Sequence, residues 1–151
     1  MGRVGRAGAP VADPRDTIIT ARAPSPVGAY PHARRAGSLL FLSGVGPRRP
    51  GDGSIPGLVQ DDRGAVRSYD FAAQCRQVFA NVRAILEDAG SSWERIVDVT
   101  VFLTDMKRDF TTFNRLYAEA FAGNQPTRTT VEVNALPTPI AVELKVIATL
   151  E

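Results

Sequence analysis

Two charged residues near the carboxyl terminus stand where strands ordinarily carry neutral side chains. Arg128 lies at the start of the β-branched segment 127–133, and Glu143 lies inside the apolar segment 141–150. An arginine fork binds a carboxylate in bidentate fashion, and a nearby carboxylate can orient or deprotonate a water molecule. The pair could therefore hold a small acid and its attacking water, or it could be a structural ion pair or a solvated rim. The two residue types alone leave both interpretations open.

The other reactive side chains give little support to the common catalytic and metal-binding sets. The chain has one histidine, His32, and one cysteine, Cys75, which are far apart in sequence and show neither metal-ligand spacing nor a nucleophile motif. Cys75 falls on the apolar stripe of a predicted helix, so we interpret it as a buried core residue. No GxxxxGKS or GxxxxGKT phosphate-binding loop is present. We therefore predict a site without a metal or an organic cofactor.

Apolar periodicity indicates the elements that must position these residues. Strands are predicted at 17–20, 38–44, 96–105, 127–133 and 141–150. One amphipathic helix is predicted between an N-cap at Ser68 and a stop at Gly90, and a second begins at about Asp109. The predicted order is β-β-β-α-β-α-β-β, in which one of the three strands before the first helix has no assigned range. Two helices of this size can cover only one face of the sheet, so we predict an α+β fold that self-associates through the other face.

Length and composition predict one domain. The chain has 151 residues, 44% of them hydrophobic and 23% charged, and no apolar run approaches the ~20 residues needed to cross a bilayer. Residues 1–16 are rich in Gly, Ala, Arg and Pro and are predicted to form a flexible tail, which leaves 17–151 as the domain. No secretory apolar segment is visible, so we expect a cytoplasmic location. The net charge of +2, without a clustered basic face, argues against a nucleic-acid partner.

These segments, in the same order, resemble the reactive-intermediate deaminase family, also called RidA or YjgF. The resemblance covers residues 17–150 and is most specific in PTRTTVEVNALP and VELKVIA, which contain Arg128 and Glu143 at a spacing of fifteen. It implies a chorismate-mutase-like fold and a barrel-like homotrimer with a ligand cleft at each subunit interface. It also implies a cytoplasmic, cofactor-independent enzyme that hydrolyses an enamine or imine to a keto acid and ammonia.

The resemblance assigns roles to individual residues of this chain. Arg128 would bind the α-carboxylate of the substrate, and Glu143 would position the hydrolytic water. The other residues implied to line the cleft are Tyr30, Gly44 and Asn114. Thr130 would lie in the same cleft, although common members of the family have a cysteine at this position. Val45 likewise stands where those members have a glutamine.

The segments GAYPHARRAG and RRP look most like the 2-aminomuconate deaminase subgroup, which acts in aromatic-compound catabolism. Its substrate is a dicarboxylate, so the second carboxylate needs its own cationic or hydrogen-bonding partner. Arg48, Arg49 and His32 are the candidates, and a solvated loop face is the alternative interpretation. The expected products are 4-oxalocrotonate (2-oxohex-3-enedioate) and ammonia. A broader deaminase of 2-imino acids or 2-aminoacrylate and a non-catalytic trimer that binds keto acids remain alternatives, while a ribonuclease has little support from this sequence.

Overall fold

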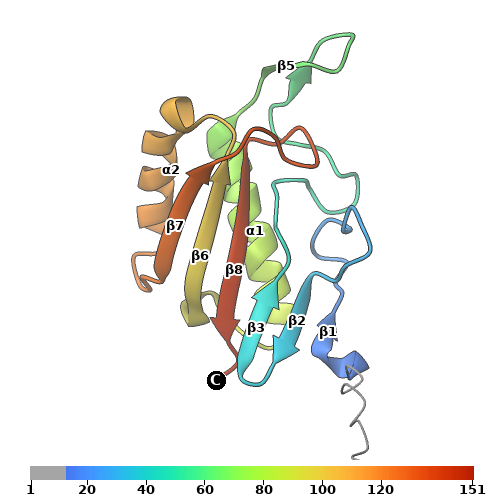
Figure 1. Ribbon diagram of the computed structural model, residues 1–151, viewed down its shortest axis with the longest axis vertical. Coiled ribbons are helices and arrows are strands. Elements are labelled where there is room, and N and C mark those ends of the chain that lie inside the picture. Colours follow the sequence, from blue (N-terminus) through green and yellow to red (C-terminus); the bar gives the residue numbers. More distant parts are fainter. Residues whose placement is uncertain (1–12) are drawn as a thin grey trace, which may run out of the picture.

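The computed structural model of the chain describes residues 13–151, which form a six-stranded sheet with two helices packed on one face (Figure 1). In chain order the strands of this sheet are β1 (Thr17–Ile18), β2 (Ala33–Ala36), β3 (Leu39–Leu42), β6 (Ile96–Leu103), β7 (Thr127–Glu132) and β8 (Val142–Thr149). Their spatial order is β1-β2-β3-β8-β6-β7. Neighbouring strands are antiparallel except β6 and β7, which run parallel. The predicted α+β class is confirmed.

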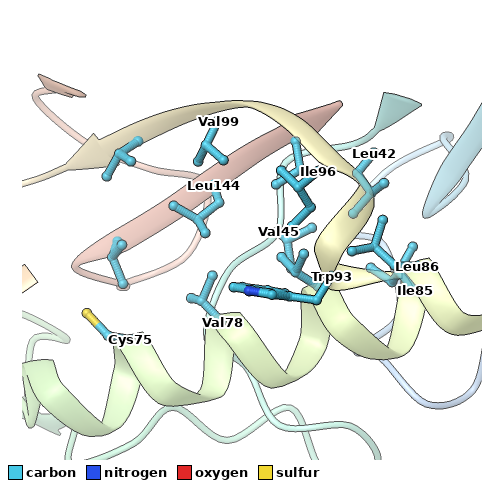
Figure 2. Packing of buried hydrophobic residues seen from close by; sticks show 14 of the residues in the cluster. Leu42, Val45, Cys75, Val78, Ile85, Leu86, Trp93, Ile96, Val99 and Leu144 are labelled. Carbon is cyan, nitrogen blue, oxygen red and sulfur yellow. The ribbon is translucent and has the colours of Figure 1, made fainter. Parts of the chain in front are cut away.

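Helices α1 (Phe71–Asp88) and α2 (Met106–Ala120) cover the sheet face on which every second residue of β6 and β8 is buried. In Figure 2 the side chains of Val99 and Leu144 on the sheet and of Cys75 and Val78 on α1 lie between the sheet and the helix. Cys75 is fully buried, as predicted, and this burial raises the pKa of its thiol to about 12. Within residues 13–151 no helix covers the opposite sheet face, and none is long and apolar enough to span a bilayer.

The first residues of α1 are capped by a side chain that the sequence pattern places in the first turn of the helix rather than at its cap. Asp70, rather than the predicted Ser68, is the N-cap, and its carboxylate accepts a hydrogen bond from the Ala73 amide at 2.9 Å. Ser68 belongs instead to the short strand that precedes the helix. At the other end Gly90 has a φ of 82° and supplies the predicted stop, because few other residues adopt this conformation at low cost.

Several elements differ from the predicted ones. β2 and a two-stranded hairpin of β4 (Val59–Gln60) and β5 (Val66–Ser68), which projects from the domain in Figure 1, are not predicted by the sequence pattern. The predicted strand at 17–20 shortens to β1. Helix α2 begins at Met106 rather than near Asp109, because the Asp105 side chain caps it by accepting from the Arg108 amide.

The predicted amino-terminal tail falls mostly outside the described residues. Residues 1–12 are not described, and Pro14–Asp16 form a single 3-10 turn. The Asp13 side chain caps this turn by accepting from the Arg15 amide at 2.8 Å. This turn lies directly before the predicted domain boundary at Thr17.

Replacing Asp70 by alanine should lower the free energy of unfolding by about 1 kcal/mol, because the Ala73 amide loses its partner. Ser68→Ala is the matched control, since Ser68 is exposed in β5 and its loss should change stability by less than about 0.5 kcal/mol. Urea unfolding followed by circular dichroism measures both changes. Equal losses in the two variants would contradict the assignment of Asp70 as the cap.

Candidate active site

Glu143 lies on the sheet face that no described helix covers, in close contact with a glycine. Its neighbours Val142 and Leu144 are fully buried on the helix side, so the alternation of β8 sends the Glu143 side chain the other way. Partial burial raises the pKa of the Glu143 carboxyl above its usual value of 4.5. A Cβ at Gly44 would collide with Glu143 Oε1 and come within 2.9 Å of its Cδ. Only glycine leaves room for this carboxylate.

A pocket opens beside the Glu143 carboxylate and brings together four of the predicted site residues. These four are Tyr30, Gly44, Arg48 and Glu143, and the remaining lining residues are Val27, Gly46, Pro137, Thr138 and Ile140. Tyr30 is 42% exposed, and its hydroxyl accepts a hydrogen bond from the Val27 amide at 3.3 Å. The wall at 137–140 is not among the predicted site residues. Its position in a proline-rich loop just before the strand of Glu143 is the signal that could have revealed it.

Arg48 and Arg49, adjacent in sequence, point to different places. Arg48 lines the Glu143 pocket, and its Nη2 donates to the Ser25 carbonyl at 2.6 Å, which fixes the guanidinium at the pocket edge. Arg49 donates to Ser54 Oγ at 3.1 Å within its own loop and lines a separate hollow, which Arg48 also borders. Of these two arginines, Arg48 alone is placed to contact a ligand held beside Glu143.

His32 holds a loop. It is buried, its Nδ1 accepts from the Thr20 amide at 3.2 Å, and its Nε2 lies 2.9 Å from the Pro24 carbonyl. Because Nδ1 accepts, Nε2 must carry the proton that is donated to Pro24, so both ring nitrogens are used by the backbone. The imidazole lines a pocket next to the Glu143 pocket but is not part of the latter. In the part of the chain that is described, no group of three His, Cys, Asp or Glu side chains is placed to hold a metal ion.

Arg128 lies on the helix side of the sheet. It pairs with Val99 across the parallel β6–β7 ladder, and Val99 is buried beneath the helices. The Arg128 Nη2 donates to Asn114 Oδ1 at 2.7 Å, which brings together two predicted site residues. Its guanidinium carbon is 5.6 Å from the Phe113 ring centroid and 4.7 Å from that of Tyr117. The amide and the π faces of α2 therefore orient the arginine at the edge strand.

Thr130 belongs to this second group and does not line the Glu143 pocket. It pairs with Val101, so it faces the helices as Arg128 does. Its Oγ1 is buried without a hydrogen-bond partner among residues 13–151. The aromatic residues of α2 beside Arg128, Phe113 and Tyr117, are not among the predicted site residues. Aromatic rings at helical spacing opposite an arginine on the next strand are the signal that could have shown their second role.

The structure separates Arg128 from Glu143. On β6, Arg128 pairs with Val99 and Glu143 with Phe102, and strand residues three apart point to opposite faces. Because β6 lies between β7 and β8, the two backbones are also about 10 Å apart across the sheet. An ion pair between Arg128 and Glu143 within one chain is therefore excluded. One chain by itself also cannot place both groups on the same small substrate.

Comparison with known proteins agrees with this fold. A family model described as Endoribonuclease L-PSP matches residues 20–150. A RutC family protein of Pyrococcus horikoshii is 40% identical over 134 residues, which cover 89% of this chain and 97% of that protein. Reactive Intermediate Deaminase A of Arabidopsis thaliana is 35% identical over 136 residues, which cover 90% of this chain and 66% of that protein.

A solved structure extends the similarity to three dimensions. The crystal structure of Escherichia coli TdcF with bound serine has a TM-score of 0.76 and 36% sequence identity to this chain, and the match covers 88% of this chain and 97% of that one. At this identity and coverage, sequence and fold give the same assignment. The chain belongs to the RidA family, which is also called YjgF or RutC.

Proposed function

We propose that the protein is a deaminase that hydrolyses small 2-imino acids and their enamine tautomers to 2-keto acids and ammonia. The observation that carries this proposal is the Glu143 carboxylate, which is partly buried, has a raised pKa and lies against Gly44 in a pocket. Such a carboxylate is suited to take a proton from water. A relative named as a reactive intermediate deaminase supports the same chemistry. The relative whose structure contains serine supports a ligand with a carboxylate next to an amine.

Completion of the site requires a second copy of the chain. We propose a homotrimer in which the Arg128 group of one copy faces the Glu143 pocket of the next. The uncovered sheet face carries apolar side chains to bury in such a contact, among them the exposed Leu39 and Val131 and the half-buried Phe41. Because the two surfaces that meet are different, the contact is heterologous, and three copies can close into a ring.

In this arrangement each group acts at a defined atom. The Arg128 fork, oriented by Asn114, binds the α-carboxylate of the substrate. Glu143 takes a proton from water and directs the water oxygen to the imine carbon. The resulting carbinolamine then loses its C–N bond and gains a C=O bond. Both protons of the water end on the nitrogen, which leaves as ammonia, and no electron is transferred.

Arg48 favours a narrower second candidate substrate, a dicarboxylate such as 2-aminomuconate. Its guanidinium lines the Glu143 pocket and is placed to pair with a second carboxylate when Arg128 of the neighbouring copy holds the first. The product would be 4-oxalocrotonate. Arg49 and His32 do not support this candidate, because both are turned to groups of their own loops.

A ribonuclease, the activity in the family model's description, is not favoured by this site. Acid-base cleavage of RNA is commonly served by paired histidines, and this chain has one histidine, whose two nitrogens bond to the backbone. The basic residue of the pocket, Arg48, shares it with the Glu143 carboxylate and does not belong to a basic groove.

Glu143→Gln should lower kcat for 2-iminobutyrate by at least about 100-fold, because the amide cannot take a proton from water. In the wild type the ionised carboxylate is the active form. Since burial raises its pKa, activity should fall as the pH drops through a midpoint above 4.5. Ammonia release from imine generated by an amino-acid oxidase measures both effects. Wild-type turnover in the variant would remove Glu143 from the mechanism.

Co-expression of Arg128→Ala with Glu143→Gln tests the shared site. Each variant alone should be inactive, yet in mixed trimers about one quarter of the interfaces combine an intact Arg128 with an intact Glu143. The mixture should therefore recover up to about one quarter of wild-type ammonia release. If the two residues acted within one chain, every site in the mixture would lack one of them, and no activity would return.

Arg48→Met should raise KM for 2-aminomuconate by about tenfold or more and leave KM for 2-iminobutyrate unchanged, because only the dicarboxylate uses this cation. Arg49→Met is the matched control and should change neither value. Steady-state ammonia release with both substrates measures the difference. Equal effects of Arg48→Met on the two substrates would contradict the proposal of a dicarboxylate substrate and would be compatible with the proposal of monocarboxylate 2-imino acids.

A further inference from the structure

The two walls of the Glu143 pocket consist largely of irregular chain. Residues 44–48 supply one wall and residues 137–140 the other. The first wall is joined to β8 at Val45, whose amide donates to the Leu144 carbonyl at 2.8 Å. Beyond this bridge the 46–48 segment leaves the sheet. Regular strand pairing therefore does not set the spacing of the two walls.

Asn81 of α1 holds the first wall. Its Nδ2 donates to the Gly46 carbonyl at 2.9 Å and to the Arg48 carbonyl at 2.8 Å. One amide group therefore bonds to two carbonyls that are two residues apart. Its Oδ1 accepts from Gln77 Nε2 at 2.9 Å, which fixes the orientation of the amide. Asn81 is only 1% exposed. The path of the chain between Gly46 and Arg48 is thus set from beneath by a buried side chain.

Gln74 of α1 holds the second wall. Its Oε1 accepts from the Ala141 amide at 2.9 Å, at the point where the loop enters β8 and two residues before Glu143. Just before this point the Ile140 amide donates to the Thr138 carbonyl at 2.7 Å, which makes a tight turn. Gln74 is fully buried. It therefore fixes the end of the turn that carries the pocket residues Thr138 and Ile140.

The two amides lie on one face of one helix. Gln74 and Asn81 are seven residues apart, about two helical turns or 10.5 Å along the axis. They interrupt the apolar stripe of α1 that packs on the sheet, where an amide is unfavourable unless it is hydrogen-bonded. Their side-chain hydrogen bonds outside the helix go to the backbones of the two pocket walls. A rigid helix with one amide for each wall sets the separation between them.

We propose that Gln74 and Asn81 are positioning residues that set the spacing of the pocket walls and thereby place Gly44 against Glu143. This inference rests on the proposed deaminase function for its kinetic readout. Loss of either amide displaces a wall without removing a group that touches substrate. Turnover should therefore fall more than binding of the carboxylate, which depends on the Arg128 group of the neighbouring copy.

The test compares Gln74→Met and Asn81→Leu, which keep side-chain volume, with Val82→Ala. Val82 is fully buried in the same helix and does not line the pocket, so its truncation reports on lost stability alone. At a temperature where all proteins are folded, the two amide variants should lose about 10- to 100-fold in kcat for 2-iminobutyrate with little change in KM. The pH at which their activity falls to half on acidification should move toward 4.5, since the Glu143 carboxyl becomes less buried when the Gly44 wall shifts.

Gln74→Glu is the rescue variant. A glutamic acid keeps the oxygen that accepts from the Ala141 amide, and Gln74 Nε2 makes no hydrogen bond within residues 13–151 that the change would break. It should restore most of the kcat that Gln74→Met loses. Amide variants that lose stability as Val82→Ala does, but keep wild-type kcat and pH midpoint, would overturn the inference.

Hydrogen exchange separates failure of this inference from failure of the proposed function. If the wild type releases no ammonia, the deaminase proposal fails, and the wall spacing is tested without turnover. Gln74→Met should speed exchange of the Ala141 amide, and Asn81→Leu that of the Val45 amide, about tenfold more than Val82→Ala does. Exchange rates equal to those of Val82→Ala would show that neither amide holds its wall.

Discussion

Side-chain alternation along β6 is the constraint on which the rest of the structure depends. This strand lies between β7 and β8, and Val99, Val101 and Leu103 anchor one of its faces beneath the helices. Because ladder partners share a face, the same register turns Arg128 toward α2 and Glu143 away from it. A slip of one residue would exchange the two faces. The apolar contacts that stabilise the core therefore also decide which face carries each functional group.

The separation of the two groups has a chemical benefit. Glu143 has a raised pKa because it is partly buried, and an arginine at contact distance in the same chain would lower that pKa again. Arg128 in turn is oriented by Asn114 and by the rings of Phe113 and Tyr117, so a carboxylate is not needed to hold it in place. Within one chain, a desolvated base and an oriented cation on opposite faces of the sheet cannot neutralise each other.

Apolar periodicity predicts both helices and the long strands, because burial imposes a period of two or of about 3.6 residues on a sequence. It does not predict β2 or the β4–β5 hairpin, which are short and gain their order from partner strands. The sheet face on which Arg128 or Glu143 lies is set by the register of its strand with β6. The spacing of residues along the sequence carries no information about this register. Arg48 and Arg49 are adjacent in sequence and differ in the loop to which each side chain bonds, so the resemblance to a known family could not tell which one reaches the pocket.

The reactivity of the single thiol of the chain, Cys75 on α1, reports how often this helix separates from the sheet. Cys75 lies next to Gln74 under the sheet, and with its pKa at about 12 it is neither accessible nor ionised in the folded protein. Thiol reagents react with the thiolate, so their reaction with Cys75 must wait until α1 lifts from the sheet. The labelling rate then measures how often that opening occurs, with no second thiol to obscure it. Because packing keeps Cys75 unreactive in the closed state, its labelling rate measures the local opening of the helix that supports the pocket walls.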